Sequence, residues 1–277
     1  IEKPKQQASL FDNPKVQALE IKLKDIRHRL FSAKTPATKR KLREEDQRLR
    51  EEMGALLVQS GWGNESAHQL ASWDPYNQNV SSGWFDPEWM FGIEDGFDVV
   101  IGNPPYVQLQ KDGGKLANAY KNCGYATFER TGDIYALFYE MGVNALKEKG
   151  YLCYITSNKW MRAGYGKSLR KFFISYNPEL LIDCGPGVFE NATVDVNILL
   201  IQNEKNQKQL SAVTLDSKAK DNNLAKFVNE RAVLLSNLNE DLWFIGSNAE
   251  QQLKEKIEQI GKPLKEWDVN INYGIKT

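Results

Sequence analysis

The sequence predicts an α/β fold with a helical hairpin in front of it. From residue 97 onward, short apolar segments alternate with amphipathic ones, which is the rhythm of strand, helix and strand. Between residues 14 and 59, apolar residues recur at three- and four-residue steps, as on one face of a helix. The length of 277 residues is enough to bury a sizeable core. We divide the chain into a tail (1–13), a helical hairpin (14–60), an aromatic-rich loop region (61–96), an α/β region (97–205), and a last region with a linker and a helix (206–277).

The composition is that of an ordinary soluble protein, and several classes of function are not expected. Hydrophobic residues make up 41% of the chain and charged residues 26%, with no apolar run long enough to cross a bilayer. The three cysteines lie far apart and form no C-x-x-C pair, so we expect no metal site and a reducing, cytoplasmic setting. Lys+Arg and Asp+Glu are 36 each, which argues against a bulk electrostatic DNA clamp but not against local patches. Because the chain starts at Ile1 rather than Met, we expect a piece of a longer protein.

Each helix of the predicted hairpin has a start signal and an apolar seam. Asn13 and Pro14 open the first helix, and Thr35 and Pro36 open the second. The seams consist of Val16, Leu19, Leu23, Ile26 and Leu30, and of Leu42, Leu49, Met53 and Leu56. The outer face of the second helix is dense in Arg and Glu. We favour a solvated structural arm, and direct contact with DNA is the alternative.

Residues 61–96 are rich in Trp, Gly, Asn and Asp, with weak periodicity. We expect an irregular loop, in which side chains such as Trp84, Phe85, Trp89 and Met90 pack against a sheet edge.

The α/β region predicts a parallel sheet that ends in an antiparallel hairpin. Its strands are Val99–Gly102, "EKGYLCYITSN", "ELLIDCG" and "DVNILLIQNE", and its helices are Ile134–Lys147 and the basic "GKSLRKFFISY". Only "PGVFENATV" joins the last two strands. A parallel crossover needs a dozen or more residues, so these two strands should be antiparallel. Farther on, a Ser247-x-x-Glu250 capping box opens a helix that carries Leu253, Ile257 and Ile260.

The strongest chemical signal is Asn103-Pro104-Pro105-Tyr106, directly after the strand "FDVVIG". Two prolines stop the strand and display an amide and an aromatic ring at its carboxyl end, where open α/β sheets keep their ligand sites. Asn103 Oδ1 and the Pro104 carbonyl could flank the amino group of a planar base and localise its nitrogen lone pair. Tyr106 offers a face for stacking, worth about 1–3 kcal/mol per base. A base in a duplex must first be flipped out.

The stretch "FDVVIGNPPY" resembles the motif of S-adenosylmethionine-dependent amino methyltransferases that act on adenine N6 in DNA. The resemblance continues through "TGDIYALFYEMGVNALKEKGYLCYITSNKWM", "GKSLRKFF" and "LLIDCGPGVFENATVDVNILLI", over about 97–203. These segments look like the methylase part of large type II restriction-modification proteins (type IIG/IIS, Eco57I-like). The resemblance implies that 97–205 is the catalytic half of a partial Rossmann-like methyltransferase sheet. It also implies that "INYGIKT" begins a target-recognition domain.

The resemblance also assigns roles to residues. Asn103, Pro104 and Tyr106 would hold the flipped adenine, and Phe189 would stack on it opposite Tyr106. Pro105 would lie against the cofactor, and Asp133 beside the cofactor pocket. Basic residues could line the DNA backbone or form a solvated face, and the sequence favours neither: Lys159, Arg162, Lys167, Arg170 and Lys171.

The family's cofactor site needs an earlier strand with a Gly-rich turn, and nothing upstream of residue 97 supplies one. The similar "LLIDCGPGVF" leaves no room for a helix whose N-terminus could receive a charged ligand, so we reject it. We therefore expect the S-adenosylmethionine-binding half and most of the target-recognition domain to lie outside this chain, with double-stranded DNA as the partner and no membrane. Two alternatives stay open: the same chemistry on cytosine N4, RNA or a protein glutamine, and a non-catalytic DNA-specificity or structural module.

Overall fold

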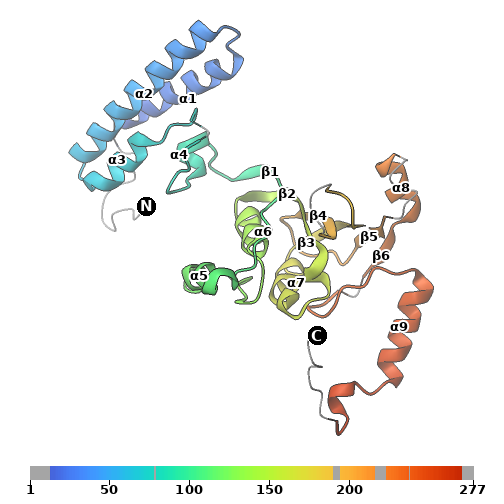
Figure 1. Cartoon of the computed structure of the whole chain (residues 1–277). Coiled ribbons are helices and arrows are strands. Elements are labelled where there is room, and N and C mark those ends of the chain that lie inside the picture. Colours follow the sequence, from blue (N-terminus) through green and yellow to red (C-terminus); the bar gives the residue numbers. More distant parts are fainter. Residues whose placement is uncertain (1–12, 78, 190–193, 216–222, 237, 270–277) are drawn as a thin grey trace. The chain divides into compact units, whose positions relative to one another are not determined.

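The computed structural model describes residues 13–77, 79–189, 194–215, 223–236 and 238–269, and Figure 1 shows the whole chain. Residues 1–12 of the expected tail and the segment "INYGIKT" lie outside these ranges. Contacts divide the chain into two compact units, Ile1–Glu94 and Asp95–Thr277. We name them the helical unit and the sheet unit and describe each by itself.

The helical unit is built on the expected hairpin. Helix α1 spans Pro14–Ser32 and α2 spans Pro36–Gln59, and the side chains of Asn13 and Thr35 cap them by accepting hydrogen bonds from the N–H groups of Lys15 and Thr38. Seven of the nine predicted seam residues are buried, and Leu30 and Leu56 are half-buried, with Leu57 buried beside Leu56. The seven are Val16, Leu19, Leu23, Ile26, Leu42, Leu49 and Met53. The helical hairpin of the predicted fold class is therefore confirmed.

The aromatic-rich region corrects the sequence analysis. It forms two further helices, α3 (Asn64–Ser72) and α4 (Pro87–Phe91). Trp62 and Trp84 pack on the core of the hairpin rather than on a sheet edge. Gly54 permits α2 and α3 to approach each other closely, because a Cβ at position 54 would lie 2.8 Å from the Ala71 Cβ. Short helices with few apolar residues carry little periodicity, so the sequence did not reveal them.

The sheet unit contains a mixed six-stranded sheet with the order β1-β2-β4-β3-β5-β6. The strands are β1 (Phe97–Gly102), β2 (Leu146–Ser157), β3 (Asn177–Gly185), β4 (Val196–Gln202), β5 (Leu210–Thr214) and β6 (Val233–Leu235). Strands β1 and β2 run parallel, as do β3 and β5, whereas β4 is antiparallel to both of its neighbours. The α/β class and the β3–β4 hairpin are confirmed. However, β4 lies inside the sheet, and β5 and β6 extend it into a region where we expected a linker.

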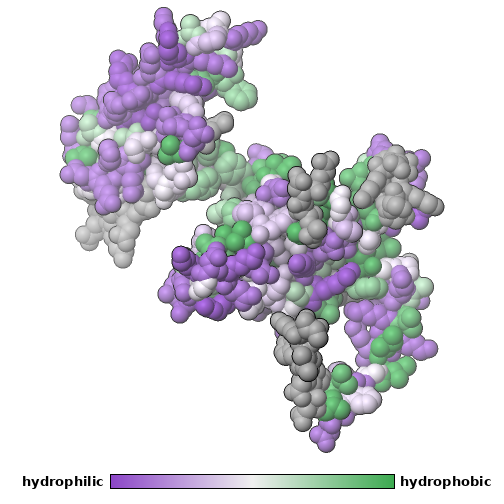
Figure 2. All heavy atoms as spheres, in the orientation of Figure 1, coloured by the Kyte–Doolittle hydropathy of each residue, from purple (hydrophilic) through white to green (hydrophobic). Residues whose placement is uncertain are grey.

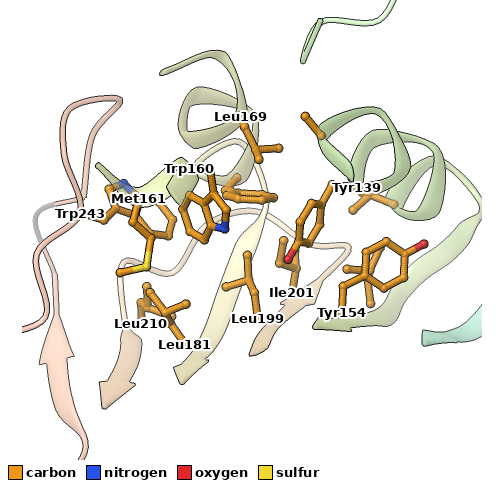
Figure 3. Packing of buried hydrophobic residues seen from close by; sticks show 14 of the residues in the cluster. Tyr139, Tyr154, Trp160, Met161, Leu169, Leu181, Leu199, Ile201, Leu210 and Trp243 are labelled. Carbon is orange, nitrogen blue, oxygen red and sulfur yellow. The ribbon is translucent and has the colours of Figure 1, made fainter. Parts of the chain in front are cut away.

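The core of the sheet unit lies mainly on one face of the sheet, where some of its helices pack. The helices of this unit are α5 (Lys111–Tyr120), α6 (Tyr135–Asn144), α7 (Lys167–Phe173), α8 (Leu224–Arg231) and α9 (Asn248–Ile260), with short 3-10 turns at Asn158–Met161, Gly164–Gly166 and Leu264–Glu266. Figure 3 shows Trp160 beside Tyr139 of α6, Leu169 of α7 and Leu199 of β4. The Ser247–Glu250 capping box at α9 is present. Among the described residues, no helix is both long and apolar enough to cross a membrane.

The opposite face of the sheet is covered unevenly. A smaller cluster of Ile182, Cys184, Val196 and Val213 lies there, with Phe227 of α8 packed against it. At the β1 end of the sheet, Val99 and Ile101 are 58% and 79% exposed. In the described chain β1 pairs with β2 alone, so it is an edge strand with an open apolar face.

Candidate active site at the carboxyl edge of the sheet

The parallel strands β1, β2 and β3 all end at the same edge of the sheet, and the candidate residues follow these ends. Asn103–Tyr106 continue from β1, Asn158 follows β2, and Cys184–Phe189 close β3 and the turn after it. Gly102, the last residue of β1, lies against the Tyr154 ring, where an added Cβ would be only 3.1 Å away. The topology thus brings segments more than 80 residues apart in sequence to one edge.

Asn103 is exposed, and its carboxamide is linked to Tyr106. The Tyr106 hydroxyl lies 3.1 Å from Asn103 Oδ1 and 3.4 Å from the Ile155 carbonyl, and it can donate its one hydrogen to either. An amide oxygen has two lone pairs, so Asn103 Oδ1 can accept a second hydrogen bond from a ligand. Burial raises the pKa of the Tyr106 hydroxyl, helped by the nearby Asp133 and Cys184, so Tyr106 stays protonated at neutral pH.

The two prolines occupy different environments. Pro104 is buried and Pro105 is exposed. Within the described chain, no backbone donor bonds to the Pro104 carbonyl. The side-chain nitrogen Nδ2 of Asn103 likewise has no hydrogen-bond partner there. Both acceptors that the chemistry needs, Asn103 Oδ1 and the Pro104 carbonyl, therefore keep capacity for a ligand.

Tyr106 and Phe189 pack against the same apolar cluster. Both are half-buried, and both contact the group formed by Ile182, Cys184 and Val196. Tyr106 also meets the Tyr135 ring edge-on, with centroids 6.3 Å apart at 89°. Burial is the main cause that raises the pKa of the Cys184 thiol to about 11, so this thiol is neutral and unsuited to nucleophilic catalysis.

Asp133 holds the segment that follows the motif. Its Oδ1 accepts a hydrogen bond of 2.8 Å from the Val107 N–H. Two backbone hydrogen bonds of 2.9 Å flank this contact, from the Ile134 N–H to the Val107 carbonyl and from the Leu109 N–H to the Gly132 carbonyl. Asp133 therefore fixes the backbone directly after Tyr106. Burial raises the pKa of the Asp133 carboxyl, and the N–H groups of Val107, Tyr135 and Ile134 oppose that shift.

The free energy of unfolding of the Asp133→Asn variant should increase relative to that of wild type as the pH rises. The pKa of the folded carboxyl lies above its ordinary value of 3.8, so the folded state binds more protons than the unfolded state in this range. Wild type therefore loses stability as the pH rises from about 4 through the folded pKa, whereas the amide loses none and still accepts from Val107. Urea unfolding of both proteins between about pH 4 and pH 7 would measure the difference. A difference that is constant, or that shrinks with pH, would contradict a buried carboxylate.

The five basic residues proposed for the DNA backbone divide into two groups. Lys159, Arg162, Lys167 and Lys171 are exposed. Arg170 is buried and donates to the carbonyls of Trp160, Ala163 and Glu240. Its guanidinium is used inside the fold, so the prediction that Arg170 contacts DNA is wrong. The sequence of a basic helix does not reveal that one of its cations, Arg170, donates to the carbonyl of Glu240, 70 residues farther along the chain.

Asn158 and Asp183 were not singled out as a pair by the sequence, although they tie two strand ends together. Asn158 Nδ2 donates to Asp183 Oδ1 at 2.9 Å, and the Gly185 N–H donates to the same oxygen at 3.2 Å. Asp183 belongs to the sequence "LLIDCGPGVF", which resembles a cofactor turn, but its carboxylate is occupied within the sheet edge. The signal that could have found the pair is a polar residue at the carboxyl end of each of two apolar strands.

Comparisons with known proteins show the family to which this chain belongs. Residues 16–189 match the sequence profile of the Eco57I restriction-modification methylase family. The match covers more than half of the chain, and the chain belongs to this family.

Two curated relatives are similar over part of their length. The type II restriction enzyme and methyltransferase RM.Eco57I of Escherichia coli is 32% identical over 190 residues, which are 65% of this chain and 19% of the relative. The type II methyltransferase M.PaeR7I of Pseudomonas aeruginosa is 38% identical over 116 residues, 42% of this chain and 19% of the relative. This chain therefore spans about a fifth of the length of the relatives it matches. Among solved structures, the ATP-dependent type ISP restriction-modification enzyme LlaBIII bound to DNA matches with a TM-score of 0.44 at 12% identity, over 64% of this chain and 15% of that chain.

Proposed function

We propose that this chain is the catalytic half of a DNA methyltransferase that modifies adenine N6 within a restriction-modification system. The observation that carries the proposal is the exposed Asn103 carboxamide at the carboxyl end of β1, bonded to Tyr106 and beside the cluster that also holds Phe189. Membership in the Eco57I restriction-modification methylase family supports the reaction class. The names of the type II relatives support DNA as the substrate.

In this proposal the chain binds and orients the acceptor base. The rings of Tyr106 and Phe189 hold a flipped adenine by stacking. Asn103 Oδ1 and the Pro104 carbonyl accept the two hydrogens of its 6-amino group, which localises the nitrogen lone pair toward the methyl donor. S-adenosylmethionine would supply an electrophilic methyl group. The amine needs no strong base before attack, so rate enhancement comes mainly from positioning.

This chain offers little of its own to a cofactor. The exposed Pro105 lies at the carboxyl edge of the sheet, where a cofactor is expected. However, the Asp133 carboxylate is bonded to the Val107 backbone, and Asp183 is bonded to Asn158. The turn at residues 185–189 is followed by no helix N-terminus among the described residues. We therefore propose that a part of the protein outside this chain holds most of S-adenosylmethionine.

The open edge of the sheet supports the proposal that another part of the protein holds most of the cofactor. Val99 and Ile101 on β1 are exposed, and an exposed apolar edge strand is a liability unless something covers it. The matched relatives are about five times longer than the region they share with this chain, which is consistent with a covering segment from elsewhere in the protein. We propose that the cofactor-binding half packs on β1. We propose further that a target-recognition domain follows this chain and selects the DNA site.

The isolated 277-residue chain should bind S-adenosylmethionine weakly or not at all. The reason is that, in the part of the chain that the structure describes, the carboxylates of Asp133 and Asp183 are already engaged within the fold. Titration calorimetry of the isolated chain should show no micromolar binding, while the full-length protein should show it. Micromolar binding to the isolated chain would overturn the division of the cofactor site.

The proposed activity is tested by incubating the full-length protein with DNA and S-adenosylmethionine labelled on its methyl group. Nuclease digestion and chromatography of the product should place the label on N6-methyladenine. Label on cytosine would show that the enzyme is a DNA methyltransferase with a different acceptor base. Label on RNA or protein would show that DNA is not the substrate. Absence of transfer to any acceptor would favour a non-catalytic module.

A further inference from the structure

The tip of the helical hairpin concentrates positive charge in a chain whose net charge is zero. Residues 27–43, here called the basic tip, contain seven Lys or Arg and no Asp or Glu. The acidic residues begin at once afterwards with Glu44, Glu45 and Asp46. Positive charge is therefore concentrated in the basic tip, whereas both signs alternate along the rest of the hairpin, and a charged region of one sign creates a local field.

Several of these cations are available to a ligand. Arg27 and Arg29 have acidic partners, Asp46 and Asp25, and the Arg43 guanidinium lies over the Tyr76 ring. The other four, Lys34, Lys39, Arg40 and Lys41, are exposed, and none makes an ion pair within the described part of the chain. Figure 2 shows mostly hydrophilic residues over the hairpin.

The placement of the charges opposes the local rule for helices. The N-terminus of a helix carries a partial positive charge and favours Asp or Glu in its first turn. Helix α2 has no acidic residue in its first turn and places Lys39, Arg40 and Lys41 in the turns that follow. Cations here reinforce the positive end of the helix instead of neutralising it. A local rule broken without a compensating contact is a mark of a functional surface.

An aromatic side chain lies within the same tip. Phe31, in the last turn of α1, is 93% exposed, the largest exposed fraction among the exposed large apolar side chains that the structure describes. Phe31 is followed by Ser32, the last residue of α1, and by Ala33 and Lys34 in the connection to α2. A basic surface with one projecting ring is suited to a nucleic acid, which presents phosphates beside sugars and bases.

We propose that the basic tip binds the phosphate backbone of double-stranded DNA, and that Phe31 adds an apolar contact to the sugar or groove. The proposal extends the proposed function, on which the choice of DNA as the partner rests, by naming a DNA contact on the helical unit. A bilayer surface fits less well, because membrane-surface helices present a continuous apolar face. Here the apolar seams of α1 and α2 are buried against each other, which leaves Phe31 as the exposed large apolar side chain among the described residues of the tip.

A matched pair of variants tests the proposal. The tip variant combines Lys39→Gln, Arg40→Gln and Lys41→Gln. The control combines Lys15→Gln, Lys22→Gln and Arg48→Gln, exposed residues of the same two helices outside the tip, so it removes the same number of positive charges. Binding of the 277-residue chain to a fluorescent DNA duplex is measured by anisotropy at salt concentrations between about 50 and 200 mM.

Each phosphate contact contributes about 0.9 to the slope of log K against log salt, so the tip variant should lose a slope of about 2–3 and about tenfold or more in affinity at the lowest salt. The control should stay within about twofold of wild type, because its three residues lie outside the basic tip and make no phosphate contact in this proposal. Phe31→Ala should weaken binding about fivefold without changing the slope, since it removes a stacking or apolar contact and no charge.

Three results would overturn the proposal: wild type that does not bind the duplex, equal losses in the tip variant and the control, or stronger binding to phosphatidylglycerol vesicles than to DNA. Circular dichroism of each variant shows whether the helices are intact. Methyl transfer by the full-length protein separates this proposal from the proposed function. If the full-length protein methylates DNA but the tip variant binds the duplex as well as wild type does, the proposed tip contact is wrong and the proposed function stands. If no methyl transfer occurs, the proposed function is wrong.

Discussion

Asn103→Ala in the full-length protein should lower kcat for DNA methylation by about a thousandfold, the loss seen when one preorganised hydrogen-bonding group of an active site is removed. The affinity for duplex DNA should stay within about threefold of wild type. The physical reason is that Asn103 Oδ1 is expected to act on the amino group of a base already flipped out, whereas duplex affinity comes mainly from phosphate contacts. Single-turnover transfer with labelled S-adenosylmethionine gives the rate, and anisotropy gives the affinity.

Two further variants separate the chemistry of Asn103 from its local structure. Asn144→Ala makes the same substitution at an exposed residue of the same unit, at the end of α6, and should leave kcat unchanged. Asn103→Asp keeps an acceptor oxygen for the Tyr106 hydroxyl and for the amine, so it should retain more activity than Asn103→Ala. Full turnover in Asn103→Ala would refute the role of the carboxamide, and equal loss in Asn144→Ala would indicate damage to the fold.

The features that the sequence predicted well are those set by local rules. Asn13, Thr35 and Ser247 cap their helices as their neighbours in the sequence indicate. The antiparallel pairing of β3 and β4 followed from the short connection between them. The placement of Asn103 at a strand end followed from the two prolines.

The features that the sequence did not reveal depend on distant partners or unusual backbone. Strands β5 and β6 are five and three residues long, too short for a periodic signal, and they are strands because the sheet pairs with them. Helix α5 contains Asp112, Gly113 and Gly114 at positive φ, residues that in a sequence indicate a turn. The shared cluster under Tyr106 and Phe189 likewise becomes visible only when the strands are side by side.

Asp46→Ala should lower the free energy of unfolding of the helical unit by about 3–5 kcal/mol, the usual cost of removing one partner from a buried ion pair. Asp46 is fully buried, and its carboxylate lies 2.7 Å from Arg50 Nε and 3.2 Å from Arg27 Nε. The two arginines also donate to the backbone carbonyls of Ala71 and Met90. One carboxylate therefore joins α1 and α2, and through the arginines it reaches the segments at the ends of α3 and α4.

Asp25→Ala is the matched control, because it removes a carboxylate from an arginine on the surface of the same helical unit. Asp25 and Arg29 are 3.1 Å apart and more than half exposed, so their separation should cost at most about 0.5 kcal/mol. Urea denaturation followed by circular dichroism gives both values. Equal costs for the two variants would mean that the buried network adds nothing to stability beyond a surface pair.

Asp46 also occupies a position that the seam assigns to an apolar residue. It lies four residues after Leu42 and three before Leu49, on the buried stripe of α2. A polar residue in such a seam can fix the register of two helices at a cost in stability. The combined variant Arg27→Met, Asp46→Leu and Arg50→Met tests this: it should recover most of the stability lost in Asp46→Ala, because no charge is then buried without a partner. Recovery of stability with an altered α1–α2 pairing, detected by cysteine cross-linking across the hairpin, would show that Asp46 specifies the register, whereas an unchanged pairing would assign that role to the apolar residues.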